Sequence, residues 1–258
     1  MSGDAREDLR GPADVIRLSA IRRRIAKHMR ASKAAAAHTL MAIEVDYSAV
    51  DAARASGRSA GLKLSYLPFV ARSLAATVED FPRLNASVEE RELHVYTRLN
   101  LGIAVDLDFE GLIVPVIRGA ADMDLLQLSS AIEDLSGRAK AGKLDVNEVA
   151  GGTFTITNAG GYGTLFTGAI INHPQVAILS TDGVLPKPVA IAREGGGYDV
   201  AVRPIGVLAL TWDHRAFDGA YTAAALQRLK HQLESRDWTA ELEAAQSLRA
   251  RLEDQKRA

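Results

Sequence analysis

The fold of this chain is constrained most by an alternation of short apolar segments, rich in β-branched residues, with longer segments whose apolar residues recur at helical spacing. The short segments are typical of strands and the longer ones of amphipathic helices. Because helices alternate with strands, we expect an α/β (α+β, two-layer) fold in which helices pack on a mixed sheet. The expected strands cover residues 38–46, 92–107, 111–117, 152–158, 175–184 and 203–213, and the expected helices cover residues 17–36, 64–82, 124–143 and 219–235.

Two of these segments carry further information. Residues 112–117 read LIVPVI, which is apolar at nearly every position. A strand without polar alternation is typical of a sheet position covered on both faces, and we expect that here. Within residues 17–36 the helix is expected to begin after Ser19, a good N-cap residue, and it has a strongly basic face that we expect to contact solvent.

Composition excludes several classes of protein. The 258 residues include 31 basic and 32 acidic side chains, so the net charge of -1 gives no reason to expect nucleic acid as a partner. Cysteine is absent, which excludes disulfides, thiolate metal sites and cysteine nucleophiles and fits a reducing compartment. The first twelve residues lack the apolar core of a signal peptide, and no apolar segment is long enough to span a membrane. We therefore expect a cytoplasmic protein.

The common cofactor motifs are also missing. The histidines show no metal-binding spacing such as HExxH, so we expect no metal site. The glycines of AGGYG, at residues 159–163, do not form the GxGxxG pattern of dinucleotide-binding folds. Neither a phosphate-binding GxxxxGK[ST] loop nor a GxSxG nucleophile elbow is present.

The stretch LTWDHRAFDGA, from Leu210 to Ala220, is the remaining candidate for chemistry. It places His214 at the end of an apolar strand and Asp218 at the start of a helix, where a general base can be held rigidly beside a cleft. A loop histidine that is hydrogen-bonded to Asp218 fits the same pattern. The residues alone leave both interpretations open.

The chain resembles the catalytic domain of the dihydrolipoamide acyltransferases, the E2 components of 2-oxo acid dehydrogenase complexes. DHRAFDGA is similar to the DHRxxDG signature of that domain. Five further stretches resemble segments of the same domain in the same order, and together they cover the chain from about Ile16 to Leu242. They are RLSAIRRRIAKHM, FPRLNAS, NLGIAVDLDFEGLIVPVI, GGTFTITNAG and AIINHPQVAIL.

The resemblance implies a chloramphenicol-acetyltransferase-like fold and a homotrimer whose active sites lie between subunits. It implies transfer of an acyl group between coenzyme A and a dihydrolipoyl arm, with the lipoyl group carried by a separate domain. His214 is then the general base that takes the thiol proton. A hydroxyl in TITN stabilises the oxyanion, and Thr157 is the expected donor, with Thr155 as the alternative on the same strand face.

The resemblance also suggests roles for charged residues. Asp218 either orients His214 as in a catalytic triad or forms a structural ion pair with an arginine, as in the related acetyltransferase. Asp213 and Arg215 belong to the signature and are expected to support the site. Arg22 and Arg23 match basic positions near the phosphates of coenzyme A, a contact that suits paired basic side chains.

The expected organisation has three parts: a flexible linker remnant at residues 1–15, the acyltransferase domain at residues 16–242, and a charged helical tail at residues 243–258. The resemblance implies a lipoyl carrier domain and the E1 and E3 components as partners. Because the tail is charged and amphipathic, we expect it to cover the surface through which related trimers build cages. Two other functions stay open: a stand-alone acyltransferase with another small acceptor, and a non-catalytic trimeric scaffold.

Overall fold

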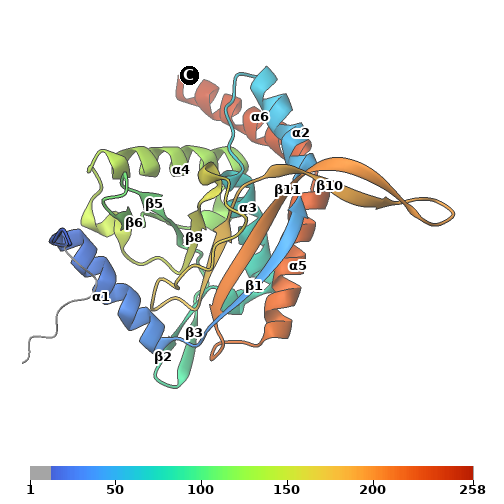
Figure 1. The fold of residues 1–258 in the computed structure, drawn as a ribbon. Coiled ribbons are helices and arrows are strands. Elements are labelled where there is room, and N and C mark those ends of the chain that lie inside the picture. Colours follow the sequence, from blue (N-terminus) through green and yellow to red (C-terminus); the bar gives the residue numbers. More distant parts are fainter. Residues whose placement is uncertain (1–12, 258) are drawn as a thin grey trace, which may run out of the picture.

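The computed structural model describes residues 13–257, with side chains through residue 251, and it is built around one mixed sheet (Figure 1). The expected linker lies mostly outside the described residues. Six strands have the order β1-β11-β9-β8-β4-β7, and β10 pairs with β11 beside this path. Two small two-stranded sheets, β2-β3 and β5-β6, lie outside it. The strands are β1 (His38–Asp46), β2 (Ala86–Glu89), β3 (Glu92–Val95), β4 (Leu101–Ile103), β5 (Val105–Asp106), β6 (Leu112–Ile113), β7 (Val116–Ile117), β8 (Phe154–Asn158), β9 (Ala177–Thr181), β10 (Leu185–Ala192) and β11 (Tyr198–Asp213).

Helices cover one face of the sheet (Figure 1). Along β11, Leu208, Leu210 and Trp212 are buried in one core with side chains of two of these helices, α3 and α5. Full burial of one such side chain contributes about 1.5–3 kcal/mol, so this layer holds β11 in one register. The helices are α1 (Ala20–Ala35), α2 (Ser48–Ser59), α3 (Leu67–Asp80), α4 (Leu125–Lys140), α5 (Gly219–Ser235) and α6 (Trp238–Arg257), with short 3-10 turns η1 (Pro82–Leu84), η2 (Ala120–Asp122), η3 (Val146–Val149) and η4 (Gly160–Tyr162).

Helix α1 begins as expected, because the Ser19 hydroxyl accepts a hydrogen bond from the backbone N–H of Arg22 at 3.2 Å. Only Ser32 is buried on this helix, and its hydroxyl donates to the carbonyl of Ile171 at 2.6 Å. The helix therefore lies on the segment between β8 and β9 and presents most of its surface to solvent.

The structure differs from the local expectations in several places. Residues 112–117 do not form one covered strand: Val114 and Pro115 separate β6 from β7, and Leu112 is 47% exposed. Proline has no backbone N–H to donate to a strand ladder, which explains the break. Helix α2 and strand β10 were not expected, and β11 begins at Tyr198, five residues before the expected strand.

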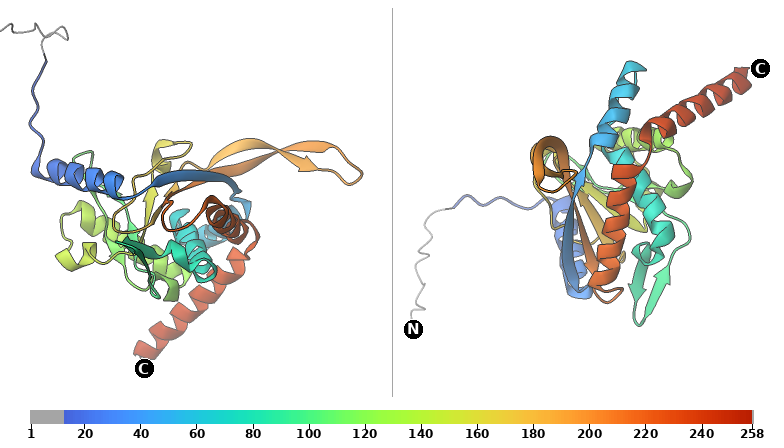
Figure 2. Two further views of the ribbon diagram at one scale, coloured as in Figure 1. Left: turned by 90° about the horizontal axis from the view of Figure 1, so that it is seen from below. Right: turned by 90° about the vertical axis from the view of Figure 1, so that its right-hand side faces the viewer.

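Strands β10 and β11 extend beyond the sheet as a two-stranded arm that projects from the body (Figure 2). Tyr198, Val200 and Val202 alternate along one face of this arm, and they are 70%, 77% and 71% exposed. An isolated two-stranded ribbon is marginally stable in water. An apolar face of this kind is typical of a surface that packs on another molecule.

The expected tail continues helix α6. Trp238 and Leu242 are each 1% exposed and anchor the first turns against the body, whereas Leu248 is 47% exposed. The rest of the helix points away from the sheet (Figure 2). Leu252, the last member of the expected apolar stripe, lies beyond the described side chains. The first half of α6, as far as the buried Ala245, therefore packs on its own chain.

Candidate functional site

His214 lies directly after β11, and its backbone is fixed while its side chain reaches solvent. The backbone N–H donates to the carbonyl of Ala37 at 2.9 Å, which ties the end of β11 to the start of β1. The imidazole lies 5.7 Å from the Trp212 ring, centroid to centroid, and the side chain is 45% exposed. A partly exposed imidazole on a fixed backbone is suitable for proton transfer.

Asp213 and Arg215 form an ion pair on either side of His214. The guanidinium donates to Oδ2 of Asp213 at 2.6 Å, and the backbone N–H groups of Arg215 and Ala37 donate to Oδ1 at 3.0 and 3.1 Å. Burial of Asp213 opposes its ionisation, but the hydrogen bonds from Arg215 and Ala37 outweigh burial and hold the pKa of this carboxyl below its ordinary value. The same contact raises the pKa of Arg215. The pair fixes the turn that carries His214.

Asp218 stands apart from this network. Its Oδ1 lies 3.8 Å from Nδ1 of His214, and its side chain is 88% exposed. This separation is longer than a hydrogen bond. Among the described residues no arginine pairs with Asp218, so the ion pair that the resemblance suggested is not formed within one chain.

The two candidate threonines on β8 differ in their hydrogen bonds. The Thr155 hydroxyl is buried and donates to Oε1 of Gln175 at 2.7 Å, so its proton is already engaged. The Thr157 side chain is half-buried and makes no hydrogen bond to any described part of the chain. Of the two hydroxyls, only that of Thr157 is free to donate to a developing oxyanion.

His214 and Thr157 are far apart within one chain. Thr157 pairs with Ser180 of β9, which pairs with Ala209 of β11. His214 follows Ala209 by five residues, so the two groups are separated by roughly 16 Å along the strands and roughly 10 Å across them. A site that uses both groups therefore needs a second chain.

Arg22 and Arg23 are exposed on the first turn of α1, near its outer end. Arg22 donates from its guanidinium to the carbonyl of Phe109 at 2.9 Å, and Arg23 donates to the carbonyl of Leu18 at 2.5 Å. The helix places them roughly 20 Å from Ala37, which holds His214. Only an extended ligand can contact both ends of α1.

The sequence did not single out the polar residues that hydrogen-bond to Thr155 or to the segment just before Asn172. Asn172 and Gln175 hydrogen-bond to the Thr155 hydroxyl. His38 on β1 accepts a hydrogen bond at Nε2 from the backbone N–H of Ile171 at 3.2 Å. Asn172 and Gln175 belong to AIINHPQVAIL, a stretch that carried the family resemblance, and this was the available signal.

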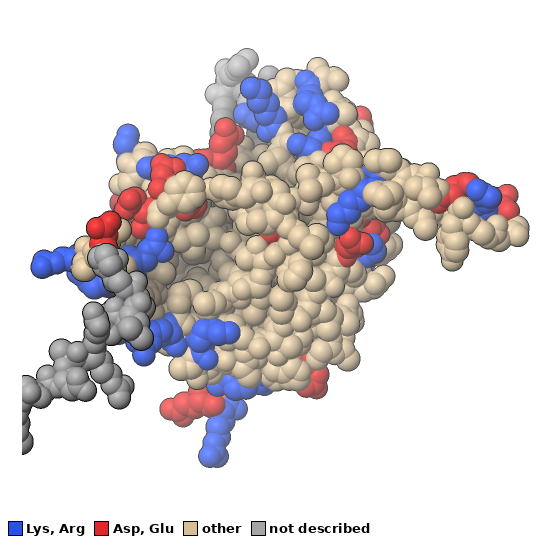
Figure 3. All heavy atoms as spheres, in the orientation of Figure 1, with Lys and Arg blue, Asp and Glu red and all other residues tan. Residues whose placement is uncertain are grey.

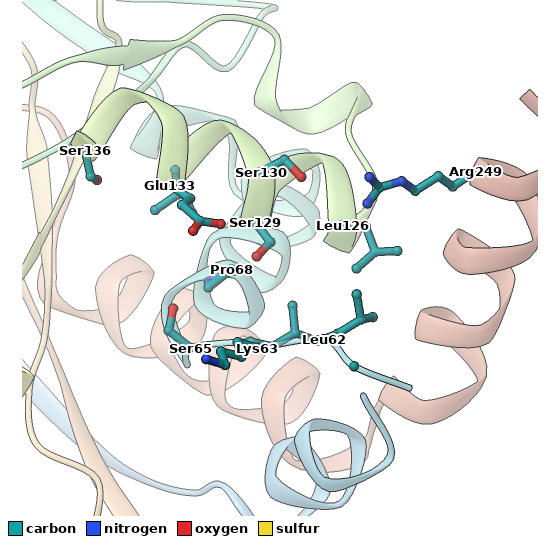
Figure 4. Close-up of a pocket in the computed structure, with 13 residues that line it drawn as sticks. Leu62, Lys63, Ser65, Pro68, Leu126, Ser129, Ser130, Glu133, Ser136 and Arg249 are labelled. Carbon is teal, nitrogen blue, oxygen red and sulfur yellow. The ribbon is translucent and has the colours of Figure 1, made fainter. Parts of the chain in front are cut away.

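A cavity of about 500 Å³ lies between α4, residues 61–65 and α6, away from these groups (Figure 4). Its lining combines Lys63, Glu133 and Arg249 with several serines and leucines, and it includes neither His214 nor either threonine. Among the described residues no group of three histidine or acidic side chains is arranged to hold a metal ion. The described helices also include none that is long and apolar enough to cross a membrane.

Comparison with known proteins shows the family of this chain. Residues 10–240 match the family of the 2-oxoacid dehydrogenases acyltransferase (catalytic domain). The chain belongs to this family. The dihydrolipoyllysine-residue acetyltransferase component of the Mycobacterium bovis pyruvate dehydrogenase complex is 38% identical over 231 residues, which cover 87% of this chain and 42% of the relative. The chain spans about half the length of the curated relatives that it matches.

Solved structures agree with the family. One is Azotobacter vinelandii dihydrolipoamide acetyltransferase, studied for the role of a serine, a histidine and an asparagine in its catalytic mechanism; it has a TM-score of 0.79 at 28% identity and covers 87% of this chain and 93% of that one. The cubic core of a pyruvate dehydrogenase multienzyme complex has a TM-score of 0.78 at 29% identity, with coverage of 87% and 93%. Chloramphenicol acetyltransferase, at 12% identity and a TM-score of 0.52 over 81% of this chain and 94% of that one, confirms the expected fold.

Proposed function

We propose that this acyltransferase domain moves an acyl group between coenzyme A and the dihydrolipoyl arm of a carrier domain. We also propose that each active site lies between two subunits of a homotrimer. The observation that carries this proposal is the position of the two groups that the chemistry needs. His214 and Thr157 both have side chains available for reaction, yet they lie in different parts of one chain, and a neighbouring subunit is needed to bring them together.

In this site His214 takes the proton of the attacking thiol as sulfur forms a bond to the thioester carbonyl carbon. The carbonyl oxygen becomes an oxyanion and accepts a hydrogen bond from the Thr157 hydroxyl. When the carbonyl reforms, the bond to the other sulfur breaks, and the departing thiolate takes the proton from His214. No proton is gained or lost overall, so one base serves both directions of the transfer.

Asp218 is assigned a supporting role in this mechanism. A triad carboxylate accepts a hydrogen bond from the imidazole of the base, whereas Asp218 is exposed and lies 3.8 Å away. The histidine and asparagine studied in the Azotobacter vinelandii enzyme also stand four residues apart, and an asparagine carries no charge. A neutral side chain at this spacing in that enzyme supports a role for Asp218 that does not depend on its charge.

Exposed apolar surface supports the trimer. Besides the arm, Val15 and Ile16 before α1 are 91% and 86% exposed, and Leu40 on β1 is 41% exposed. The face that carries β1 and β11 shows few charged side chains at its centre (Figure 3). Such surfaces are normally buried between subunits. A cyclic trimer buries each of them by repeating one contact between neighbouring subunits.

Arg22 and Arg23 are proposed to bind the phosphates of coenzyme A. Their distance from the His214 end of α1 requires an extended ligand, and coenzyme A carries its phosphates and its thiol at opposite ends. The proposed partners are a lipoyl carrier domain and the E1 and E3 components, and the proposed location is the cytoplasm.

The experiment that tests this function is an assay of the purified protein with dihydrolipoamide and acetyl-, succinyl- or branched-chain acyl-coenzyme A. We expect acyl-dihydrolipoamide to form with one of these donors. His214→Ala should lower turnover by several orders of magnitude without changing the mass of the trimer. Turnover that falls less than tenfold in this variant would show that another group is the base.

A further inference from the structure

Asp182 has a buried carboxylate that accepts hydrogen bonds from three hydroxyl groups. It follows β9 directly and is 4% exposed. Its Oδ1 accepts hydrogen bonds from the hydroxyls of Thr164 and Thr167, and its Oδ2 accepts one from Ser180 at 2.5 Å. In the described part of the chain no lysine, arginine or histidine pairs with it. A carboxylate removed from water needs strong hydrogen bonds, so these contacts are charge-assisted and restrict the residues that make them.

The carboxylate joins two segments that are distant in sequence. Thr164 belongs to the segment after β8, and its hydroxyl also lies 3.2 Å from the carbonyl of Ala159. Its own carbonyl accepts a hydrogen bond from Gly183 at 2.9 Å. The two backbones lie so close that a Cβ on Gly160 would be 2.7 Å from the carbonyl oxygen of Asp182. Residues 159–167 are thus held against the ends of β8 and β9.

We call the contacts of the Asp182 carboxylate with Thr164, Thr167 and Ser180 the Asp182 clamp. This clamp affects the position of Thr157 in two ways. Ser180, whose hydroxyl is held by Asp182, is the register partner of Thr157 on the neighbouring strand. Residues 159–167 also begin only two residues after Thr157. Their attachment to Asp182 therefore fixes the backbone at the end of β8. Since an oxyanion donor must be held within a fraction of an ångström, both routes bear on the reaction.

We propose that Asp182 is a positioning residue that sets the Thr157 hydroxyl for oxyanion stabilisation by clamping residues 159–167 and Ser180. This inference rests on the proposed function, because it needs Thr157 as the donor. The clamp itself is independent of that role. Loosening of the clamp can be measured by proteolysis, because chymotrypsin cleaves after Tyr162, Leu165 and Phe166. These residues are 69%, 61% and 48% exposed.

The test compares Asp182→Ala with Asp182→Asn in the intact trimer. Alanine removes the acceptors, whereas asparagine can accept from the threonines through its carbonyl and donate to the Ser180 oxygen through its amide. We expect Asp182→Ala to lower kcat by roughly 10- to 100-fold with less than a threefold change in KM for coenzyme A. Asp182→Asn should restore at least a third of the wild-type kcat. The matched control is Asp134→Ala, which removes an exposed carboxylate that pairs with Arg138 on α4.

Limited chymotrypsin digestion gives a second measurement that does not depend on acyl transfer. Cleavage after Tyr162, Leu165 or Phe166 should be at least tenfold faster in Asp182→Ala than in the wild type, and close to wild type in Asp182→Asn. Faster cleavage with an unchanged kcat would overturn the positioning role and leave the proposed function intact. An equal loss of kcat in Asp182→Ala and Asp182→Asn would also overturn the positioning role, because the hydrogen bonds that asparagine can keep would then make no difference. A wild-type protein without acyl transfer would instead refute the proposed function, and the digestion would still report on the clamp.

Discussion

Mixing two inactive variants tests whether His214 and Thr157 come from different chains. His214→Ala lacks the base, and Thr157→Ala lacks the oxyanion donor, so trimers of the latter should keep roughly 1% of wild-type turnover and trimers of the former far less. In a random trimer of equal parts, each site takes its histidine from one chain and its threonine from the next. A site is intact when a Thr157→Ala chain supplies the histidine and a His214→Ala chain supplies the threonine, which occurs in about a quarter of sites.

We therefore expect co-refolded mixtures to regain about 25% of wild-type turnover, roughly 25 times that of the Thr157→Ala parent. The assay is acyl transfer to dihydrolipoamide at saturating acyl-coenzyme A, after light scattering has shown that trimers have reformed. The matched control is a mixture of wild type with the double variant. If the sites are shared between chains, this mixture should keep about a quarter of wild-type activity; if each site lies within one chain, it should keep about half. Mixed parents that stay below about 1% would refute the shared site.

Four further results are expected. Thr157→Ala should lower kcat roughly a hundredfold with little change in KM, whereas Thr155→Ala should mainly lower the melting temperature, because it leaves the Gln175 amide without its donor; the reverse pattern would move the oxyanion donor to Thr155. Asp218→Asn should leave the melting temperature unchanged and lower kcat less than tenfold, and a loss near 10⁴-fold would instead indicate a triad. Asp213→Asn should lower the free energy of unfolding by about 2 kcal/mol at neutral pH. The pKa of Asp213 lies below its ordinary value of 3.8. The difference in unfolding free energy between wild type and Asp213→Asn should therefore persist above pH 3.8 and vanish as the pH falls through the lower pKa of the folded state. Denaturant titrations that show the same difference at every pH would contradict the ion pair. Removal of the residues after Leu242 should let larger assemblies form, and a particle of unchanged mass in light scattering would show that α6 does not cover a docking surface.

The sequence predicts the elements whose pattern is local. Helix α5 and the second half of β11 have clear periodicity and lie where the sequence placed them. Strand β10 was missed because it contains Pro186 and Pro188, which are rare within strands and are tolerated here because β10 pairs with only one other strand. The break at Pro115 was missed because residues 112–117 are almost entirely apolar. This composition was given more weight than the backbone N–H that proline lacks.

The candidate site was only partly accessible from sequence. The sequence singled out His214 from its position after an apolar strand, and the family resemblance suggested Thr157. The separation of these two residues depends on the register of β8, β9 and β11, which no local pattern specifies. The resemblance favoured Thr157 over Thr155, but the physical reason, a hydrogen bond from Thr155 to Gln175 20 residues further along the chain, is visible only in the folded structure. The Asp182 clamp joins hydroxyls from two segments, and only the folded chain shows that they share one carboxylate.

The distance between His214 and Thr157 also has a genetic consequence. In the proposed trimer every chain supplies the base of one site and the hydroxyl of another. A chain that has lost both groups, yet still folds, would disable two of the three sites in any trimer that it joins. A cell with one intact and one defective copy of this gene would then lose more activity than the share of defective chains, so such an allele would behave as partly dominant.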